Sequence, residues 1–132
     1  DNTLHDAGPH IFPHINRSMT AYLREHLQLS EEEANATRTR YWKTYGATLL
    51  GLVRHHGTDP HHFLHQTHQF PELDRMVVSD RAELNAVRRL RGRKILYTNS
   101  PHRYAAAVLG VLGIAGLFDA VYAIEHVRFQ AK

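Results

Sequence analysis

The sequence contains no cysteine and no apolar run as long as a membrane-spanning helix. Without cysteine, the chain cannot form disulfide bonds, thiolate metal sites or a cysteine nucleophile. This composition fits a reducing compartment, and we expect a cytoplasmic protein. A membrane helix needs about 20 apolar residues, so we expect no membrane partner. Hydrophobic residues make up 42% and charged residues 22% of the 132 positions, as in one globular domain with room for a subdomain.

The excess of positive over negative charge is also small, because the formal net charge is only +3. Basic side chains are dense at one place, which comprises Arg88, Arg89, Arg91, Arg93 and Lys94. We interpret this cluster as the solvated end of a helix, where cations complement the helix dipole. A contact with nucleic acid is the alternative interpretation, and we expect no nucleic-acid partner.

Helical periodicity fills the first half of the chain and predicts three helices in series. The first covers 13–29. A capping box of Ser30 with Glu33 begins the second, a single long helix that continues to a left-handed cap at Gly57. The third runs from the Asp59-Pro60 pair, an N-cap followed by proline, to about Gln69.

A helix, a strand, a helix and a strand are predicted in the second half. The first helix lies between a cap at Ser79 or Asp80 and a stop at Gly92. A strand at 95–98, a helix at 101–112 and a strand at 120–124 follow. The inward positions of the two helices are Leu84, Val87 and Leu90, then Tyr104, Val108, Val111 and Leu112. The run at 95–98 is continuously β-prone, which predicts a strand covered on both faces. Two strands joined through a helix predict a parallel βαβ unit.

Polar clusters fall at the ends of the predicted elements. They are Asp1-Asn2-Thr3, Thr98-Asn99-Ser100 and Lys132. We expect Ser100 to cap the next helix and Pro101 to occupy its first turn. Ligands of parallel sheets bind beyond the carboxyl ends of the strands, and helix N-termini there suit anions. A carboxylate, hydroxyls and an ammonium together indicate an anion site, whereas Asp-Asn-Thr alone is also a common turn.

Two of these clusters resemble motifs of a known superfamily. Asp1-Asn2-Thr3-Leu4 resembles the second half of the DxDxT loop of the haloacid dehalogenase superfamily, and Leu96-Tyr97-Thr98-Asn99 resembles its second motif. The helical insertion between them, of about 75 to 90 residues, is similar to the C1 type of cap. The resemblance implies an α/β fold: a partial Rossmann-like core with a parallel sheet (1–8 and 79–132) and an inserted α-helical cap subdomain (9–78).

The cap sequence narrows the resemblance. Residues 41–52 (YWKTYGATLLGL), with His56 and Asp59-Pro60, are similar to the cap of the pyrimidine 5′-nucleotidase branch. This likeness implies that Tyr45 and Gly46 contribute to nucleotide binding. The alternative is a plain core stripe made of Tyr41, Tyr45, Leu49 and Leu52. Gly46 and Gly51 inside a helix indicate close approach by another helix or a ligand.

The resemblance also implies roles for individual residues. Asp1 would be the general acid and base, its backbone carbonyl would bind Mg²⁺, Thr98 and Asn99 would bind the phosphoryl group, and Lys132 would steady its charge. The nucleophilic Asp is expected two residues before Asp1 and the fourth motif beyond Lys132, so we expect a fragment of a longer protein that has no turnover by itself. The parent would be a Mg²⁺-dependent phosphatase whose substrate is a small phosphomonoester, foremost a pyrimidine nucleoside 5′-monophosphate.

Other functions stay open at this point. A sugar-phosphate or phosphoglycolate-type phosphatase, or a non-catalytic regulatory protein with this fold, is compatible with the same motifs. The twelve histidines suggest a metal-binding module, because His61, His65 and His68 share one face of the third predicted helix. An exposed helix surface that is rich in histidine explains the same spacing more simply.

Overall fold

The computed structural model describes residues 1–130 and divides into two compact units. The core unit comprises 1–13 and 70–128, and the helical unit comprises 14–69 with 129–130. The predicted cap at 9–78 therefore contains residues 14–69 and extends beyond them at both ends. The elements in chain order are α1 (Ile11–Leu27), α2 (Glu31–Tyr45), α3 (Thr48–His56), α4 (Pro60–Thr67), α5 (Leu73–Met76), α6 (Arg81–Arg89), β1 (Ile95–Tyr97), α7 (His102–Val111), η1 (Ala115–Leu117), β2 (Ala120–Tyr122) and η2 (Ile124–Val127).

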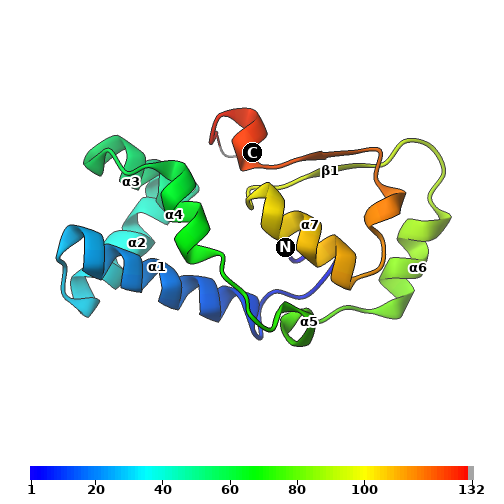
Figure 1. Ribbon diagram of the computed structural model, residues 1–132, viewed down its shortest axis with the longest axis horizontal. Helices are drawn as coiled ribbons and strands as arrows, with labels where there is room; N and C mark the ends of the chain where they lie inside the picture. Colours follow the sequence, from blue (N-terminus) through cyan, green and yellow to red (C-terminus); the bar gives the residue numbers. More distant parts are fainter. Residues whose placement is uncertain (131–132) are drawn as a thin grey trace. The chain divides into compact units, whose positions relative to one another are not determined.

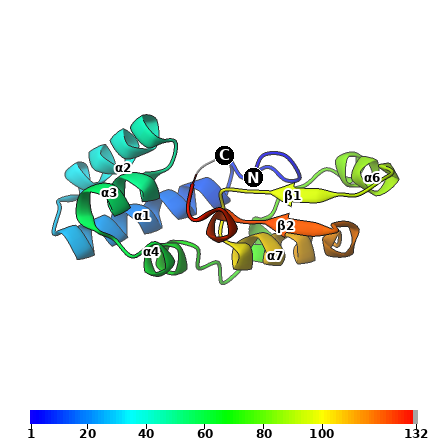
Figure 2. The ribbon, with the colours of Figure 1, turned by 90° about the horizontal axis from the view of Figure 1, so that it is seen from above.

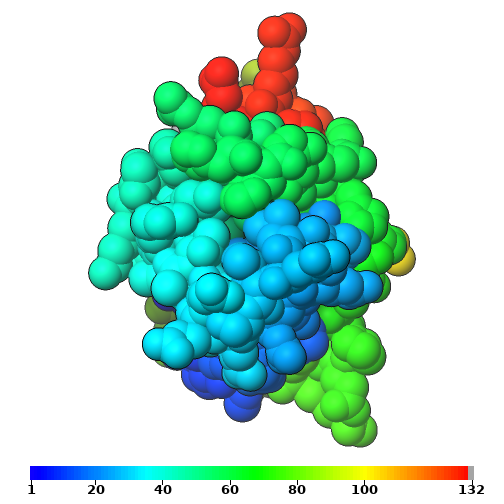
Figure 3. Space-filling model, turned by 90° about the vertical axis from the view of Figure 1, so that its left-hand side faces the viewer, coloured from blue at the N-terminus to red at the C-terminus, as the bar shows by residue number. Residues whose placement is uncertain are grey.

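The helical unit buries the apolar faces of α1, α3 and α4 against one another. Figure 3 shows one face of the molecule, on which the blue atoms of α1, the cyan atoms of α2 and the green atoms of α3 and α4 are visible. Leu23, Leu52 and Phe63 are completely buried, and the ring of Tyr22 meets that of Phe63 edge-on at 5.0 Å between centroids. The predicted three-and-four spacing of apolar residues thus forms a real core.

The predicted starts of α2 and α4 are confirmed. The Glu33 N–H donates to Ser30 Oγ at 3.2 Å, and the Ser30 N–H donates to the Glu33 carboxylate at 2.9 Å. Asp59 accepts from the His61 N–H at 3.0 Å, with proline in the first turn of α4. These local bonds satisfy N–H groups that would otherwise lack partners at the helix N-termini.

The predicted single long helix is wrong, because the chain forms the α2–α3 hairpin instead. Gly46 ends α2 in the left-handed region with φ +81°, and Ala47 is extended before α3 begins. Gly51 then packs against Tyr41, and a Cβ at Gly51 would overlap that ring. The two glycines therefore act as a turn and a close contact, and the predicted close approach is confirmed at Gly51.

The core unit contains the predicted βαβ arrangement. β1 pairs in parallel with β2, with Ile95 opposite Ala120 and Tyr97 opposite Tyr122. α7 runs alongside the two strands (Figures 1 and 2). The described residues therefore form a mostly helical chain with a small parallel sheet, a partial α/β fold.

Three burial predictions in the core unit are wrong. The strand is not covered on both faces, because Ile95 is 53% exposed and Tyr97 is 42% exposed. Both side chains lie on the same side of a two-stranded sheet, since alternate residues share a face. Leu90 at the end of α6 and Val111 on α7 are also exposed, whereas Ala105 and Leu109 are buried on α7.

None of the helices within residues 1–130 combines the length and the apolar character that a membrane span requires.

Candidate functional site

Residues 1–8 form a closed loop. Asn2 adopts the left-handed region with φ +58°, a conformation that asparagine tolerates better than most residues. Its side-chain oxygen accepts the Ala7 N–H at 2.8 Å across five residues. This bond folds the loop back so that His5 lies next to Asp1.

One backbone bond attaches the loop to the rest of the core unit, and a second bond closes a turn within the loop. The Asp6 N–H donates to the Val78 carbonyl at 2.7 Å, in an isolated antiparallel bridge. The Asp6 carboxylate accepts the Gly8 N–H at 2.9 Å. The sequence from Asn2 to Gly8 thus encodes its own turn chemistry.

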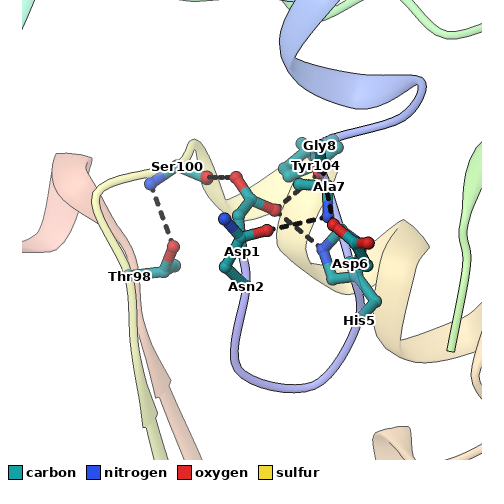
Figure 4. A network of polar contacts seen from close by, with 9 residues as sticks. All are labelled: Asp1, Asn2, His5, Asp6, Ala7, Gly8, Thr98, Ser100 and Tyr104. Carbon is teal, nitrogen blue, oxygen red and sulfur yellow. Dashed lines mark hydrogen bonds and ion pairs between the residues drawn. The ribbon is translucent and has the colours of Figure 1, made fainter. Parts of the chain in front are cut away.

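The Asp1 carboxylate is the centre of the polar network in Figure 4. Its Oδ1 lies 2.8 Å from His5 Nε2 and accepts the Tyr104 hydroxyl at 2.7 Å. Its Oδ2 accepts the Ser100 hydroxyl at 3.3 Å. The Asp1 side chain is only 15% exposed, so the donors hold it in a largely enclosed position.

His5 and Tyr104 are themselves buried, at 4% and 4% exposure. Burial lowers the pKa of the His5 imidazole, which favours its neutral form. Because a carboxylate only accepts hydrogen bonds, His5 Nε2 must carry the proton in this contact. His5 Nδ1 then has no hydrogen-bond partner among the described residues. Burial also raises the pKa of the Tyr104 hydroxyl, which therefore remains a donor.

The end of β1 places Thr98 and Ser100. The Thr98 N–H donates to the Tyr122 carbonyl at 2.9 Å, which extends the strand pairing by one residue. The Thr98 hydroxyl oxygen accepts the Ser100 N–H at 3.0 Å in a tight turn. This turn directs the Ser100 hydroxyl to Asp1.

The prediction that Ser100 caps α7 is wrong. Pro101 occupies the N-cap position, and the side chain of Ser100 is bonded to Asp1 instead. The Glu125 carboxylate accepts the His102 N–H through both oxygens at 3.1 Å. An anionic side chain of the chain itself therefore lies at the N-terminus of α7, where an external anion was expected.

A cavity of about 310 Å³ adjoins the network. Its polar lining includes Asp1, Thr3, His5 and Thr98, while β1, α7 and Phe118 supply the apolar walls. The structure thus brings together two predicted residues, Asp1 and Thr98, that are far apart in the sequence. The volume lies at the lower end of the range typical of small-molecule sites.

The other predicted site residues lie elsewhere. Asn99 is exposed and does not line this cavity, and Lys132 lies outside the described residues. Tyr45 and Gly46 belong to the helical unit. The Tyr45 hydroxyl is bonded to His55 Nε2 at 2.6 Å, and Gly46 caps α2. Each has a structural role within that unit, and their part in nucleotide binding stays a prediction.

The alternative of a core stripe is confirmed for three of its four members. Tyr41, Leu49 and Leu52 are buried, whereas Tyr45 is only half-buried. Tyr41 also stacks on the His55 ring, with 5.3 Å between centroids. The tyrosines of this stripe are therefore engaged within the helical unit.

The histidines of α4 do not form a metal centre in this structure. His61 and His65 are exposed, and His68 is half-buried at the C-cap. Within residues 1–130, no three His, Cys, Asp or Glu side chains are close enough together to hold a metal ion. The exposed-surface interpretation of the α4 histidines is therefore the better supported one.

Sequence reasoning overlooked His5 as a site residue and assigned Tyr104 to the core alone. It included Ser100 in a polar cluster of the site but gave it the role of a helix cap rather than a contact with Asp1. The asparagine, aspartate and glycine of the first loop are signals of tight turns, but its sequence does not reveal which side chain meets Asp1. Tyr104 follows the expected inward face of α7, and only its hydroxyl distinguishes it from a core residue. The chain matches no known family model.

Proposed function

We propose that the chain is part of a Mg²⁺-dependent phosphomonoesterase of the haloacid dehalogenase superfamily. Its favoured substrates are pyrimidine nucleoside 5′-monophosphates. The motifs around Asp1 and Thr98 carry this assignment, together with the helical insertion between them. The partial α/β fold of the described residues is compatible with it.

One observation supports the proposal more than any other. Asp1 and Thr98 line the same cavity, which runs along β1 and reaches Thr98 just past the carboxyl end of that strand, although the two residues are 97 positions apart in the chain. Ligands of parallel sheets bind at this edge. A carboxylate and a hydroxyl at such an edge suit proton transfer and phosphoryl binding in one site.

The proposed mechanism assigns a chemical task to each predicted catalytic residue. The aspartate expected two positions before Asp1 attacks phosphorus and forms an aspartyl-phosphate. Asp1 donates its proton to the leaving oxygen, and it then removes a proton from the water that hydrolyses the intermediate. Thr98 hydrogen-bonds a phosphoryl oxygen, and Lys132 neutralises part of its charge.

The chemistry of the site also suits Mg²⁺, which prefers oxygen ligands. The backbone carbonyl of Asp1, which the resemblance assigns to the metal, is an oxygen ligand of this kind. The described residues supply only part of a ligand set, since they contain no cluster of three acidic or histidine ligands. Bound Mg²⁺ would neutralise phosphoryl charge, and further ligands would come from the upstream aspartate and the fourth motif.

The test is phosphatase activity of the full-length protein. UMP, CMP, AMP and small sugar phosphates should be assayed with and without Mg²⁺. We expect Mg²⁺-dependent release of phosphate, fastest from UMP or CMP. A folded protein with an intact upstream aspartate that hydrolyses none of them would contradict the proposal, as would any other residue at that upstream position.

Replacing Asp1 tests the assigned chemistry directly. Asp1→Asn keeps the size of the side chain but removes its capacity to exchange a proton. Turnover should fall by about 100- to 10,000-fold. Asp6→Asn is the matched control, because Asp6 is an exposed carboxylate of the same loop and does not line the cavity. Near-normal turnover of Asp1→Asn would remove Asp1 from its role.

A further inference from the structure

We infer that His5 and Tyr104 are positioning residues that fix the Asp1 carboxylate for proton transfer. This inference rests on the proposed function, because it assigns a catalytic task to Asp1. Neither residue belongs to the motifs that suggested the site. Both come from the folded arrangement of the first loop and α7 in Figure 4.

The two donors converge on one carboxylate oxygen. His5 Nε2 and the Tyr104 hydroxyl lie 2.8 and 2.7 Å from Asp1 Oδ1, whereas the Ser100 hydroxyl lies 3.3 Å from Oδ2. Two short bonds to Oδ1 fix the rotation of the carboxylate about its Cβ–Cγ bond. The bond to Oδ2 is longer and therefore weaker, so we assign the exchange of a proton with substrate to Oδ2.

Further contacts hold the elements that carry these donors. His5 is held by the loop that the Asn2–Ala7 bond closes, and this loop is joined to Val78. Tyr104 stands in the first turn of α7, and its ring packs on Phe70 at 5.0 Å between centroids. Positioning of this kind contributes to catalysis, because a displacement of about 1 Å can cost about 100-fold in rate.

The buried Nδ1 of His5 is evidence against a purely structural role for this side chain. Its Nδ1 has no partner among the described residues, although the side chain is buried. A buried polar atom without a hydrogen bond costs stability. An apolar residue of similar volume would avoid this cost, so the benefit of histidine must lie in the bond that it makes to Asp1.

Two variants remove the donors from the full-length enzyme. His5→Leu deletes the imidazole N–H, and Tyr104→Phe deletes only the hydroxyl. Each should lower kcat about 10- to 100-fold, with little change in KM. His5→Gln should restore most of the activity, because its Nε2 lies the same number of bonds from the backbone. His10→Leu and Tyr122→Phe are the matched controls, since both residues are exposed.

A double-mutant cycle separates positioning from general destabilisation. If His5 acts through Asp1, His5→Leu should have no further effect on kcat in an Asp1→Asn background. A structural role would lower kcat equally in both backgrounds. Normal kcat in His5→Leu and Tyr104→Phe, or equal losses in both backgrounds, would overturn the inference while leaving the proposed function intact.

A spectroscopic measurement needs no turnover. In full-length protein with ¹⁵N-labelled histidine, His5 Nε2 should carry a proton that exchanges slowly, and Asp1→Ala should shift this signal and speed the exchange. A signal that is insensitive to Asp1→Ala would overturn the positioning inference whether or not the wild-type protein is active. If the signal responds to Asp1→Ala but the wild-type protein has no phosphatase activity, the proposed function is contradicted. The contact between His5 and Asp1 then has only a structural role.

Discussion

Tyr41 lies so close to Gly51 that no side chain fits between them. The two residues join α2 to α3 within the helical unit. We expect Gly51→Ala to lower the free energy of unfolding by about 1–3 kcal/mol, because the new methyl group would displace the Tyr41 ring. This cost exceeds the gain of about 1 kcal/mol that alanine normally brings to a helix. Urea unfolding followed by circular dichroism measures the difference.

Gly110 provides the matched control for this substitution. It also lies inside a helix, α7, but a Cβ there would meet no atom within 4 Å. Gly110→Ala should therefore raise the free energy of unfolding by up to about 1 kcal/mol. Opposite signs at the two glycines are expected, and equal signs would contradict the close contact between α2 and α3.

The capping box at the start of α2 predicts a dependence of stability on pH. The hydrogen bonds from Ser30 lower the pKa of the Glu33 carboxyl below its ordinary value of 4.5. The ionised form therefore stabilises the folded state above that value, and this contribution disappears as the pH falls through the folded-state pKa. Glu33→Ala should destabilise the protein at pH 7 and lose this effect at acidic pH.

Glu32→Ala is the control for the capping box. Glu32 lies in the same first turn but makes no capping bond. Its replacement by alanine removes the same charge as Glu33→Ala. Thermal unfolding of both variants between pH 3 and 7 separates the cap from the helix dipole. A Glu33→Ala effect that equals that of Glu32→Ala at every pH would show that the hydrogen bonds contribute nothing.

Local chemistry explains why parts of the fold could be predicted. The starts of α2 and α4 depend on side chains within three residues of the cap, so the sequence identifies them. The parallel β1–β2 pair follows from a strand, helix and strand in succession. The break at Gly46 was overlooked because glycine is compatible with a helix interior, and only tertiary packing selects its left-handed conformation.

The candidate site also contains residues that the sequence identifies and contacts that only the folded chain creates. Asp1 and Thr98 stand out in the sequence, because each lies in a polar cluster at the end of a predicted element and in a segment that resembles a superfamily motif. His5 does not stand out, and the contacts that His5 and Ser100 make to Asp1 arise only after the first loop closes and the chain turns at the end of β1. Exposure of Ile95 and Tyr97 could not be predicted either, because the number of layers around a strand is a property of the whole fold.

Thr98 offers a direct test of phosphoryl binding in the full-length protein. Thr98→Val removes the hydroxyl with almost no change in shape, and kcat/KM should fall by about 100-fold. Thr98→Ser keeps the hydroxyl and should remain within a few-fold of the wild type. Steady-state kinetics with the best substrate distinguishes them, and equal activity of the two variants would exclude the hydroxyl from binding.

The hydrogen bonds between Asp119 and Lys94 lead to a prediction about the stability of the sheet rather than about the site. The Lys94 N–H donates to Asp119 Oδ2 at 2.7 Å, and the Asp119 N–H donates to the Lys94 carbonyl at 2.8 Å. This reciprocal pair fixes the register where β1 and β2 begin. Asp119→Ala should therefore lower the free energy of unfolding by about 1 kcal/mol and speed hydrogen exchange at the Lys94 amide.

Two further variants are controls for this prediction. Asp119→Asn retains an acceptor oxygen and should lose less stability than Asp119→Ala. Asp74 is an exposed carboxylate of α5, so Asp74→Ala should leave the exchange at Lys94 unchanged. Slow exchange at Lys94 in Asp119→Ala would mean that strand pairing alone sets the register.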